Sequence, residues 1–497
     1  MGLPDDTWVG LDLGTQGARC TVVSSSGELL GRASSPLTSR RDGDRHEQDP
    51  EDWWRAVCRA CRAAVADVPR DSIRAVAGCA TSGTILLVNR AGAPLTPGLM
   101  YDDTRATDEA RRVNEVGEAK WASLGYRMQP SWALPKLLWL RGHDGETPPD
   151  ARLAHQADFV SRRLVGRDVA ADASHALKSG YDLLEETWPH RELAELGIGS
   201  DVMPDVVRPG TRLGPIGREA AEATGIPAGT PVVAGMTDGC AAHIGAAGGT
   251  GALEAGSWNS DLGTTLVLKG VSRRLVHDAA GGVYSHRSPD GDWLLGGASS
   301  VGAGTLSAHY PGRDVDALSA RAAEREPAGA VSYPLVSRGE RFPFTRPDAE
   351  AFIVGAPADE GDHFAALLQG VAFVERLCFD YLDLLGAPTH GQISLSGGAA
   401  RSRYWSQLRA DVLRRPVRVS ASGDAGLGMA LLAAASLSGK RLADVAAEML
   451  RPGDTVEPRP GAGERFRRPY LRLIEELERR GWVPEALASH GRSRAAA

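Results

Sequence analysis

The sequence has little of what marks several large classes of protein. Its six cysteines are scattered along 497 residues, which is not the spacing of a disulfide framework. It contains no uncharged apolar run of 18 residues, so no membrane-spanning helix is expected. The net charge of −7 argues against a nucleic-acid-binding surface, which needs an excess of basic residues. We therefore expect a cytoplasmic protein with neither a nucleic-acid nor a membrane partner.

The composition is that of a folded chain. Hydrophobic residues make up 42% and charged residues 24%, enough apolar surface to offset the entropy of an ordered chain. The length exceeds what one hydrophobic core supports, roughly 250–300 residues, and predicts two large domains or about three smaller ones. The 59 glycines predict many tight turns or close approaches of the backbone.

The pair Cys58 and Cys61 has the spacing of a redox or zinc motif. It lies within a helical run that starts at Trp53, and the sequence contains no second such pair. We therefore interpret both as helix residues that pack in the core.

Strands and helices alternate along the chain. The opening predicts three antiparallel strands at 8–13, 18–23 and 29–33, then a helix at 51–66 and a strand at 73–79. From residue 257 the pattern begins again, with a Gly-Thr turn between two apolar strands. Further along, the sequence predicts helices at 364–385, 402–413, 426–438 and 466–480 and strands at 393–396 and 416–420. This alternation is typical of an α/β fold.

Two turns are suited to binding phosphate. Asp12-Leu13-Gly14-Thr15 joins the first two strands, and a Gly-Thr turn can direct backbone N–H groups and a hydroxyl at an anion. The neighbouring carboxylate could hold a hydrated Mg²⁺. Alone, Asp12 could equally be structural, but Gly263-Thr264 repeats the turn in the second half. Together the two turns indicate a clamp on a polyphosphate across a cleft.

Two further segments join strand to helix. Asp238 follows the strand at 232–234 and begins a helix, where a carboxylate can accept a proton from a hydroxyl or simply cap the helix. Gly397-Gly398 precedes a helix, so a flat ring could lie against the backbone and the helix N-terminus could bind phosphate or ribose.

In this order, these segments resemble the FGGY carbohydrate kinases. Further matches are Glu47–Trp54 and Lys136–Leu140, and the resemblance extends from residue 8 to about 440. It implies an α/β fold of two ribonuclease-H-like, actin-like ATPase domains, each a mixed sheet flanked by helices, with the active site in the interdomain cleft. The implied domains are 1–245 (sugar, first phosphate turn, catalytic Asp), 246–450 (second phosphate turn, adenosine), a linker and docking helix at 451–488, and a disordered tail at 489–497.

Within the family the chain is most similar to the compact D-ribulokinases. The segments are Thr81–Leu87, His175–Tyr181, Gly282–His286, Trp293–Gly304 and Tyr333–Phe344. In the sugar-site segment, glycerol kinases carry an Arg-Glu pair and xylulokinases a Met-His pair, whereas this chain has the small, uncharged Ser82-Gly83-Thr84.

The resemblance also implies roles for single residues. Asp238 would be the general base and Asp12 would assist it, both on Mg²⁺ through water. Substrate contacts would come from Asp12, Ser82, Tyr101, Asp102 and Asp238. The ATP contacts would come from Gly14, Thr15, Gln16, Gly263, Thr264, Ala303, Gly397, Gly398 and Ser402. The expected reaction transfers the γ-phosphate of ATP to the terminal hydroxyl of D-ribulose.

The sequence departs from the subgroup near the sugar. Cys79-Ala80 stand where Asp-Gly is usual, and His175 stands where Asn is usual. Exchange of one polar partner can change substrate discrimination by orders of magnitude. D-xylulose, L-ribulose or a pentitol or tetritol therefore remain alternative substrates, and an inactive nucleotide-binding scaffold is an alternative of another class. We expect a monomer or a homodimer.

Overall fold

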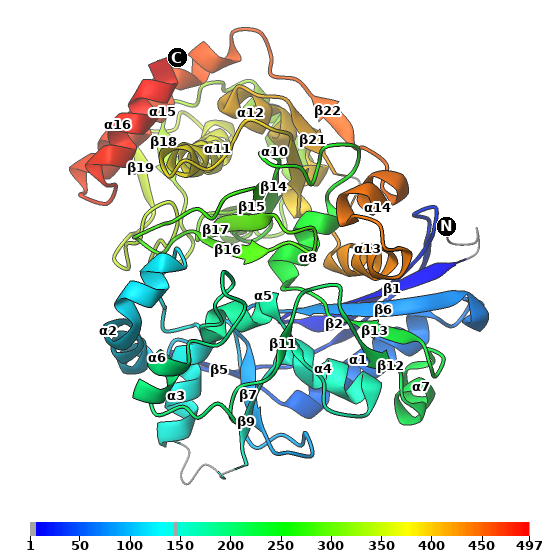
Figure 1. Ribbon diagram of the computed structural model, residues 1–497. Coiled ribbons are helices and arrows are strands. Elements are labelled where there is room, and N and C mark those ends of the chain that lie inside the picture. Colours follow the sequence, from blue (N-terminus) through cyan, green and yellow to red (C-terminus); the bar gives the residue numbers. More distant parts are fainter. Residues whose placement is uncertain (1–5, 144–147, 149, 421, 497) are drawn as a thin grey trace. The chain divides into compact units, whose positions relative to one another are not determined.

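The computed structural model describes residues 6–143, 148, 150–420 and 422–496 (Figure 1). By their contacts the residues form two compact units. Unit 1 comprises Met1–Gly245, His286–Leu294 and Asp424–Leu450. Unit 2 comprises Ala246–Ser285, Leu295–Gly423 and Arg451–Ala497.

Unit 1 is built on a six-stranded mixed sheet. Its strands, in spatial order, are β12 (Arg212–Pro215), β13 (Pro231–Val233), β6 (Ile73–Ala80), β1 (Thr7–Leu13), β2 (Gly17–Ser24) and β3 (Leu29–Pro36). Strands β1, β2 and β3 are antiparallel neighbours, whereas β6 is parallel to both β1 and β13. All seven residues of β1 are buried, which agrees with a strand covered on both faces.

Smaller sheets and helices complete unit 1. A five-stranded sheet contains β4 (Arg40–Asp42), β5 (Arg45–Gln48), β8 (Gly98–Leu99), β7 (Ile85–Val88) and β9 (Arg152–His155), and β10 (Ala171–Asp172) pairs with β11 (Val206–Val207). The helices are α1 (Pro50–Ala64), α2 (Thr107–Ser123), α3 (Ala133–His143), α4 (Gln156–Val165), α5 (Ala173–Ala176), α6 (His190–Glu195), α7 (Arg218–Thr224), α8 (Asp238–Gly245), α13 (Ala425–Ser438) and α14 (Leu442–Met449).

Unit 2 contains most of a seven-stranded sheet, of which only the end of β16 and the start of β17 are grouped with unit 1. Its spatial order is β16 (Tyr284–Arg287), β17 (Trp293–Ser299), β15 (Leu266–Ser272), β14 (Trp258–Leu262), β20 (Ile393–Ser396), β21 (Val417–Val419) and β22 (Asp454–Val456), and β18 (Val331–Tyr333) pairs with β19 (Phe352–Val354). The helices are α9 (Gly304–His309), α10 (Val315–Ala323), α11 (Glu360–Leu384), α12 (Arg403–Leu413), α15 (Ala462–Arg479) and α16 (Glu485–Ala496).

The two large sheets repeat one topology. In each, the first strand (β1 or β14) pairs antiparallel with the next (β2 or β15) and parallel with a later strand (β6 or β20). A further parallel strand and an antiparallel edge strand follow in both. This confirms the predicted α/β class with two domains, each a mixed sheet flanked by helices.

By its contacts, helix α13 groups with unit 1, although its residues fall within the predicted second domain of 246–450. In Figure 1 the orange helix α13 lies beside β1, drawn in blue. A Cβ at Gly10 of β1 would collide with the carbonyl of Gly426, and one at Gly428 would collide with that of Ala241 in α8. Glycine is required at these points because the backbones approach so closely. The sequence pattern of α13 alone could not reveal which sheet it covers.

The predicted disordered tail at 489–497 is wrong for residues 489–496, which form part of α16; Ala497 lies outside the described residues. Leu487 and Ala488 of this helix are buried in the core of unit 2, and Arg494 forms an ion pair of 2.8 Å with Asp380 of α11. The tail is polar and Ala-rich, so its order comes from these distant contacts. The predicted linker also contains a strand, β22.

An ion pair is enclosed in the core of unit 2. Arg409 of α12 donates to both carboxylate oxygens of Glu375 in α11, at 2.7 and 2.8 Å, and neither residue is exposed. Ser260 of β14 donates to Glu375 at 2.6 Å and accepts from Arg409 at 2.7 Å. The pair thus fixes two helices to the strand that precedes the Gly263-Thr264 turn.

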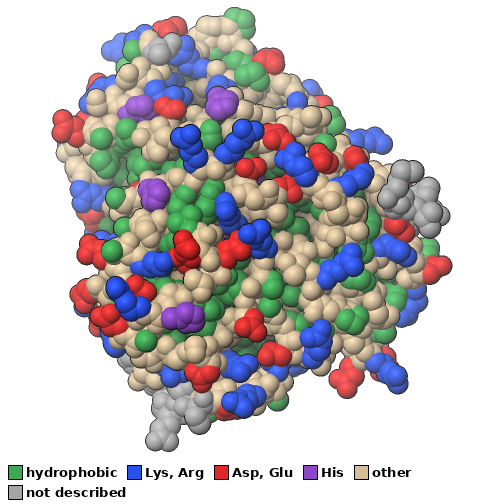
Figure 2. Space-filling model, in the orientation of Figure 1, with side chains coloured by type: hydrophobic (Ala, Val, Ile, Leu, Met, Phe, Trp, Pro, Cys, Tyr) green, Lys and Arg blue, Asp and Glu red, His purple; other side chains and the backbone are tan. Residues whose placement is uncertain are grey.

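The outer surface carries both signs of charge. Figure 2 shows basic and acidic side chains interspersed over the visible face. Of the helices in the described part of the chain, none combines the length and the apolar character needed to cross a bilayer.

Candidate active site

Asp12 lies at the end of β1, in a row of side chains that crosses three strands. The register places Arg19 of β2 and Cys79 of β6 directly beside it. Arg19 donates to one carboxylate oxygen at 2.7 Å, and the Cys79 thiol lies 3.7 Å from the other. Burial raises the pKa of Asp12 above its ordinary value, although the Arg19 charge opposes this shift. Asp12 is therefore a buried carboxylate with one fixed cationic partner.

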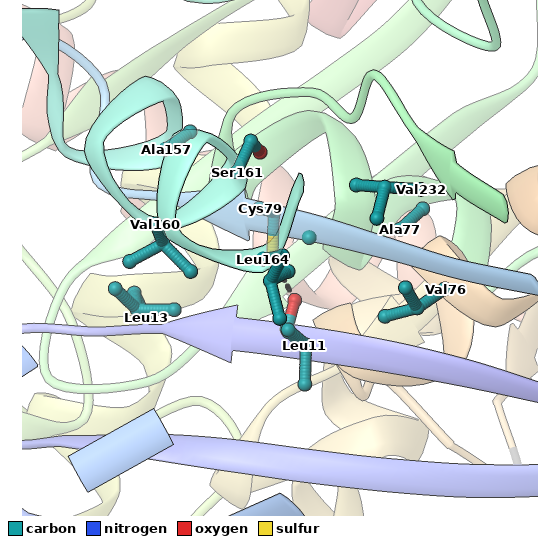
Figure 3. Close-up of a pocket in the computed structure, with 11 residues that line it drawn as sticks. Leu11, Leu13, Val76, Ala77, Cys79, Ala157, Val160, Ser161, Leu164 and Val232 are labelled. Atoms are coloured by element: carbon teal, nitrogen blue, oxygen red, sulfur yellow. Dashed lines mark hydrogen bonds between the residues drawn. The ribbon is translucent and has the colours of Figure 1, made fainter. Parts of the chain in front are cut away.

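The part of the sheet around Asp12 is closely packed. Figure 3 shows a small apolar cavity of about 10 Å³ between β1, β6 and α4, lined by Leu11, Leu13, Val160 and Leu164 among others. The dashed line marks the Cys79 thiol, which donates to the carbonyl of Leu11 at 3.4 Å. The cavity is too small for a substrate. Its packing holds the ends of β1 and β6 in register.

Asp238 is the first residue of α8, after β13 and a short loop. Its carboxylate accepts a hydrogen bond of 2.8 Å from the backbone N–H of Gly239. Burial, with a further contribution from the negative charge of Asp12, raises the pKa of Asp238 to about 6. The structure thus brings the two predicted acids within electrostatic reach of each other, as the motifs indicated.

The loop before Asp238 is anchored by hydrogen bonds. The N–H of Thr237 donates to the hydroxyl of Ser174 in α5 at 3.2 Å, and Ser174 also lies 3.1 Å from Nδ1 of His286. Thr237 forms a parallel bridge with Ala80 at the end of β6. The position of Asp238 is thus set by α5 and β6.

His175 and Ala80, two of the residues that depart from the subgroup pattern, are in contact. Its Nδ1 lies 2.7 Å from Asp172 and its Nε2 lies 3.2 Å from the carbonyl oxygen of Ala80. Because a carboxylate and a carbonyl both accept hydrogen bonds, both ring nitrogens carry protons and the ring is cationic. Burial opposes this charge, but Asp172 outweighs it and raises the pKa of His175 to about 9. This cation favours the ionised form of Asp238.

Ser82 lies in a tight turn between β6 and β7. Thr81 and Thr84 are hydrogen-bonded at 2.5 Å, and Thr81 also donates to Gln156 at 2.9 Å. Lys178 donates to the carbonyl oxygen of Ser82 at 3.1 Å. In the described part of the chain, the buried hydroxyl oxygen of Ser82 has no hydrogen-bond partner. A hydroxyl held in a rigid turn without a partner is suited to a polar ligand.

Tyr101 and Asp102 follow β8. The Asp102 carboxylate lies 2.5 Å from Nδ1 of His46 and 2.7 Å from Arg41. Burial raises the pKa of Asp102, but the bonds from His46 and Arg41 outweigh it, and the net shift is downward. Both carboxylate oxygens are therefore engaged by protein groups, and the predicted sugar contact of Tyr101 and Asp102 stays a prediction.

The first phosphate turn lies between β1 and β2. Gly14 donates to the carbonyl of Gly17 at 3.1 Å, and Gln48 donates to the carbonyl of Thr15 at 2.7 Å. The carbonyl of Gln16 accepts from Leu37 at 3.0 Å. These bonds fix the backbone, while Thr15 is partly exposed and Gln16 is exposed.

The second phosphate turn, in unit 2, lies between β14 and β15. Ala303 donates to the carbonyl of Gly263 at 2.8 Å, and Gly304 donates to that of Thr264 at 3.1 Å. The structure thus brings together three of the predicted ATP contacts, Gly263, Thr264 and Ala303.

The predicted adenosine segment follows β20. Gly397 has a φ of +83°, and a Cβ there would lie 2.6 Å from the carbonyl oxygen of Leu262, next to the second phosphate turn. Gly398 faces open space. Ser402 is the N-cap of α12, where its hydroxyl accepts from Trp405 at 3.2 Å. Gly397 must therefore be glycine, and Gly398 leaves room for a ligand.

Sequence reasoning missed Asp261, the residue of unit 2 equivalent to Asp12. Asp261-Leu262-Gly263-Thr264 repeats Asp12-Leu13-Gly14-Thr15 letter for letter, a signal that was available in the sequence. Its carboxylate accepts 2.7 Å from Ser396 of β20, and Ser396 accepts 3.0 Å from Asn259. Burial raises the pKa of Asp261 against the effects of Ser396 and Arg409.

Known proteins share this architecture and these turns. Residues 7–245 match the N-terminal domain of the FGGY family of carbohydrate kinases, and residues 260–437 match its C-terminal domain. The chain belongs to the FGGY family of carbohydrate kinases. It is therefore a sugar kinase of the class that uses ATP and a divalent metal ion.

Individual relatives span nearly the whole chain. A xylulose kinase of Klebsiella pneumoniae is 29% identical over 468 residues, 91% of this chain and 93% of the relative. An autoinducer-2 kinase of Yersinia pestis (strain Pestoides F) is 27% identical over 474 residues, 88% of this chain and 89% of the relative. The crystal structure of a xylulose kinase from Rhodospirillum rubrum superposes with a TM-score of 0.84 at 25% identity, covering 95% of this chain and 99% of that one.

Proposed function

We propose that this protein transfers the γ-phosphate of ATP to the terminal hydroxyl of a ketopentose, with D-ribulose as its preferred substrate and D-ribulose 5-phosphate as the product. The observation that carries the proposal is Asp238, a carboxylate with a pKa of about 6 beside the buried Asp12. A general base works best when its pKa lies near the working pH.

In the proposed mechanism, Asp238 accepts the proton of the sugar hydroxyl as that oxygen attacks the γ-phosphate. At neutral pH, Asp238 is mainly ionised, since its pKa is about 6. The cationic His175 helps to keep it so. Arg19 holds the Asp12 carboxylate in place at 2.7 Å. Phosphoryl transfer depends mainly on positioning and charge neutralisation, which these fixed groups supply.

The acids also fit a magnesium ion. In the described part of the chain, no group of three or more His, Cys, Asp or Glu side chains is arranged to hold a metal. Mg²⁺ in kinases needs fewer protein ligands, because substrate phosphates and water supply the rest. Asp12 and Asp238 would hold it through water, and their mutual repulsion favours a nearby cation. When bound, Mg²⁺ neutralises charge that develops on the phosphate oxygens.

ATP would be bound by both phosphate turns. We assign the phosphates to Gly14, Thr15 and Gln16 in unit 1 and to Gly263, Thr264 and Ala303 in unit 2. The adenosine is assigned to Gly397, Gly398 and Ser402. The bonds from Ala303 and Gly304 to the second turn support this, because they hold its backbone rigid before the nucleotide arrives.

The sugar preference is supported by the turn at Ser82, whose buried hydroxyl oxygen has no partner among the described residues. We assign it to a hydroxyl of the ketose, with Tyr101 and Asp102 closing the same side. D-xylulose is the second candidate, because several of the similar proteins are xylulose kinases.

An ADP-release assay tests the proposal. Purified protein is given Mg-ATP with D-ribulose, D-xylulose, L-ribulose, pentitols, erythritol and glycerol in turn. Asp238→Asn is the test variant, and Asp67→Asn, which changes an exposed carboxylate of the same unit, is the control. We expect the highest kcat/KM with D-ribulose and loss of activity only in Asp238→Asn.

The other outcomes are equally informative. A clear preference for D-xylulose would replace the substrate but keep the mechanism. Full turnover by Asp238→Asn would overturn the assignment of the base. ATP binding without turnover of any sugar would favour the inactive scaffold.

A further inference from the structure

We propose that unit 2 contains a second anion site, which binds the phosphate group of a small molecule. The site is a cavity of about 320 Å³ between α11, the start of β20, the end of α12 and α16. It is lined by Arg376, Phe379, Asp380, Thr389, Ile393, Leu413, Arg414, Arg415 and Arg494. The lining includes neither Gly263-Thr264 nor Gly397-Gly398, and Ile393 lies at the opposite end of β20 from Gly397.

Four arginines converge on this cavity, and two of them lack an acidic partner. Arg376 is only 6% exposed, donates to the carbonyl of Val412 at 3.3 Å and lies over the ring of Tyr470. Arg415 donates to the carbonyls of Thr389 and Gly391. Among the residues that the structure describes, no carboxylate lies within ion-pairing distance of Arg376 or Arg415. Neither guanidinium therefore forms the direct ion pair that buried guanidinium groups normally have.

The nearby carboxylates, Asp380 and Asp383, already have partners within the protein. Arg494 pairs with Asp380 at 2.8 Å and with Asp383 at 2.9 Å. Asp380 also accepts a hydrogen bond of 2.5 Å from Tyr470. The cavity is therefore lined by four guanidinium groups and one carboxylate. That carboxylate, Asp380, is already bonded to Arg494 and Tyr470.

Electrostatics agrees with this geometry. Burial lowers the pKa of Arg376; Tyr470 and Asp380 oppose this shift, whereas the charges of Arg414 and Arg494 add to it. Burial and the charge of Arg494 lower the pKa of Arg415 as well. A bound anion would relieve both the desolvation and the repulsion.

The side chains that line the site favour phosphate. Planar guanidinium groups bind phosphate oxygens in pairs, and several together are typical of phosphate recognition. The lining also includes Phe379, Ile393 and Leu413, which leave apolar surface for a short carbon skeleton. Both inorganic phosphate and a phosphorylated metabolite share this chemistry.

Isothermal titration calorimetry on the full chain tests the site, with inorganic phosphate and D-glucose 6-phosphate as separate probes. The test variants are Arg415→Gln and Arg414→Gln, and Arg472→Gln removes an exposed charge of α15 as the matched control. Thr264→Ala reports phosphate that binds at the second phosphate turn instead. We expect both test variants to raise the Kd at least tenfold, and Arg472→Gln and Thr264→Ala to leave it unchanged.

Each result decides the matter. A Kd unaffected by Arg415→Gln and Arg414→Gln, or raised only by Thr264→Ala, would overturn the proposal. If circular dichroism shows that Arg415→Gln does not fold, the exposed Arg414 provides the deciding variant. The tighter of the two probes identifies the source, free phosphate or a phosphorylated metabolite. The test does not depend on sugar kinase activity.

Discussion

Cys79 and Ser396 occupy the same position in the two repeated sheets, but their contacts with the neighbouring aspartate differ in length. Each lies on the strand parallel to the one that carries Asp-Leu-Gly-Thr, directly beside the aspartate. Ser396 donates to Asp261 at 2.7 Å, whereas the thiol of Cys79 lies 3.7 Å from Asp12. Asp261 is thus held by Ser396 of the parallel strand β20, whereas Asp12 is held mainly by Arg19 of the antiparallel strand β2.

From this arrangement we expect Asp261 to be a positioning residue for the proposed nucleotide site. Its charge orients Ser396, which immediately precedes Gly397, so Asp261→Asn should loosen the adenosine segment. Hydrogen bonds to charged groups contribute about 1.5–3 kcal/mol, and we expect the KM for ATP to rise roughly tenfold or more with the KM for sugar unchanged. Steady-state kinetics with each substrate varied in turn measures this.

The control for that experiment is Asp454→Asn, which alters an exposed carboxylate on β22. Equal rises in both KM values, or none in Asp261→Asn, would contradict the positioning role.

We expect the buried charge of Asp238 to lower the stability of the folded protein while it serves catalysis. Because its pKa is raised to about 6, the folded protein binds this proton more tightly than the unfolded chain does. The charge therefore costs stability as the pH rises from about 4 to 6. The full shift corresponds to about 3 kcal/mol, but Asp238 keeps some solvent contact, so we expect Asp238→Asn to gain about 1–2 kcal/mol at pH 7.

The same variant should lose about 10²–10⁴-fold in kcat, the usual contribution of a general base. In the unaltered protein, kcat/KM should fall tenfold per pH unit below about pH 6. Urea unfolding and a pH–rate profile measure the two effects. A variant that is both active and less stable would contradict the assignment.

His175 should make stability depend on pH in the alkaline range. Its pKa is about 9 in the folded protein, above its ordinary value of 6.5. The stabilisation is therefore fully present below about pH 6.5 and is lost as the pH rises through 9, at a cost of up to about 3 kcal/mol. His175→Asn should abolish this dependence, and the exposed His190→Asn should not. Urea midpoints at pH 6.5, 8 and 9 test this, and a parallel decline in all three proteins would contradict it.

The enclosed pair of Arg409 and Glu375 should be sensitive to loss of one partner. Glu375→Gln leaves a buried guanidinium without its counter-charge, which typically costs about 3–5 kcal/mol. Replacing both residues by leucine should cost less, because no unpaired charge remains. Denaturant unfolding of the single and double variants measures the difference. A single variant as stable as the original would show that the pair contributes little.

The local elements could be read from the sequence. The strands at 8–13, 18–23 and 73–79 and the start of α8 at Asp238 follow from apolar runs and turn residues, and all are confirmed. Cys58 and Cys61 lie on α1 as expected, and burial raises the pKa of Cys58 to about 12, so the thiol stays protonated. These features depend on short-range preferences that a sequence displays.

Features that depend on distant partners could not be predicted. The bond from His175 to the carbonyl of Ala80 joins residues 95 positions apart, and the four arginines of the anion cavity come from two helices, α11 and α16, and from the loop that follows α12. Helix α16 is ordered by its contacts with α11 rather than by its own sequence. Asp261 is the exception, because the repeated tetrapeptide was there to be recognised.

The path of the chain through α13 has a consequence for synthesis. Unit 1 begins at the N-terminus but includes Asp424–Leu450, and its first strand packs against the glycines of α13. On the ribosome, unit 1 therefore cannot complete its core until residue 450 of 497 has emerged, when most of unit 2 is already outside the exit tunnel. Unit 1 is synthesised first but completes its fold late. A chain truncated before residue 424 would lack α13, the helix that packs on β1.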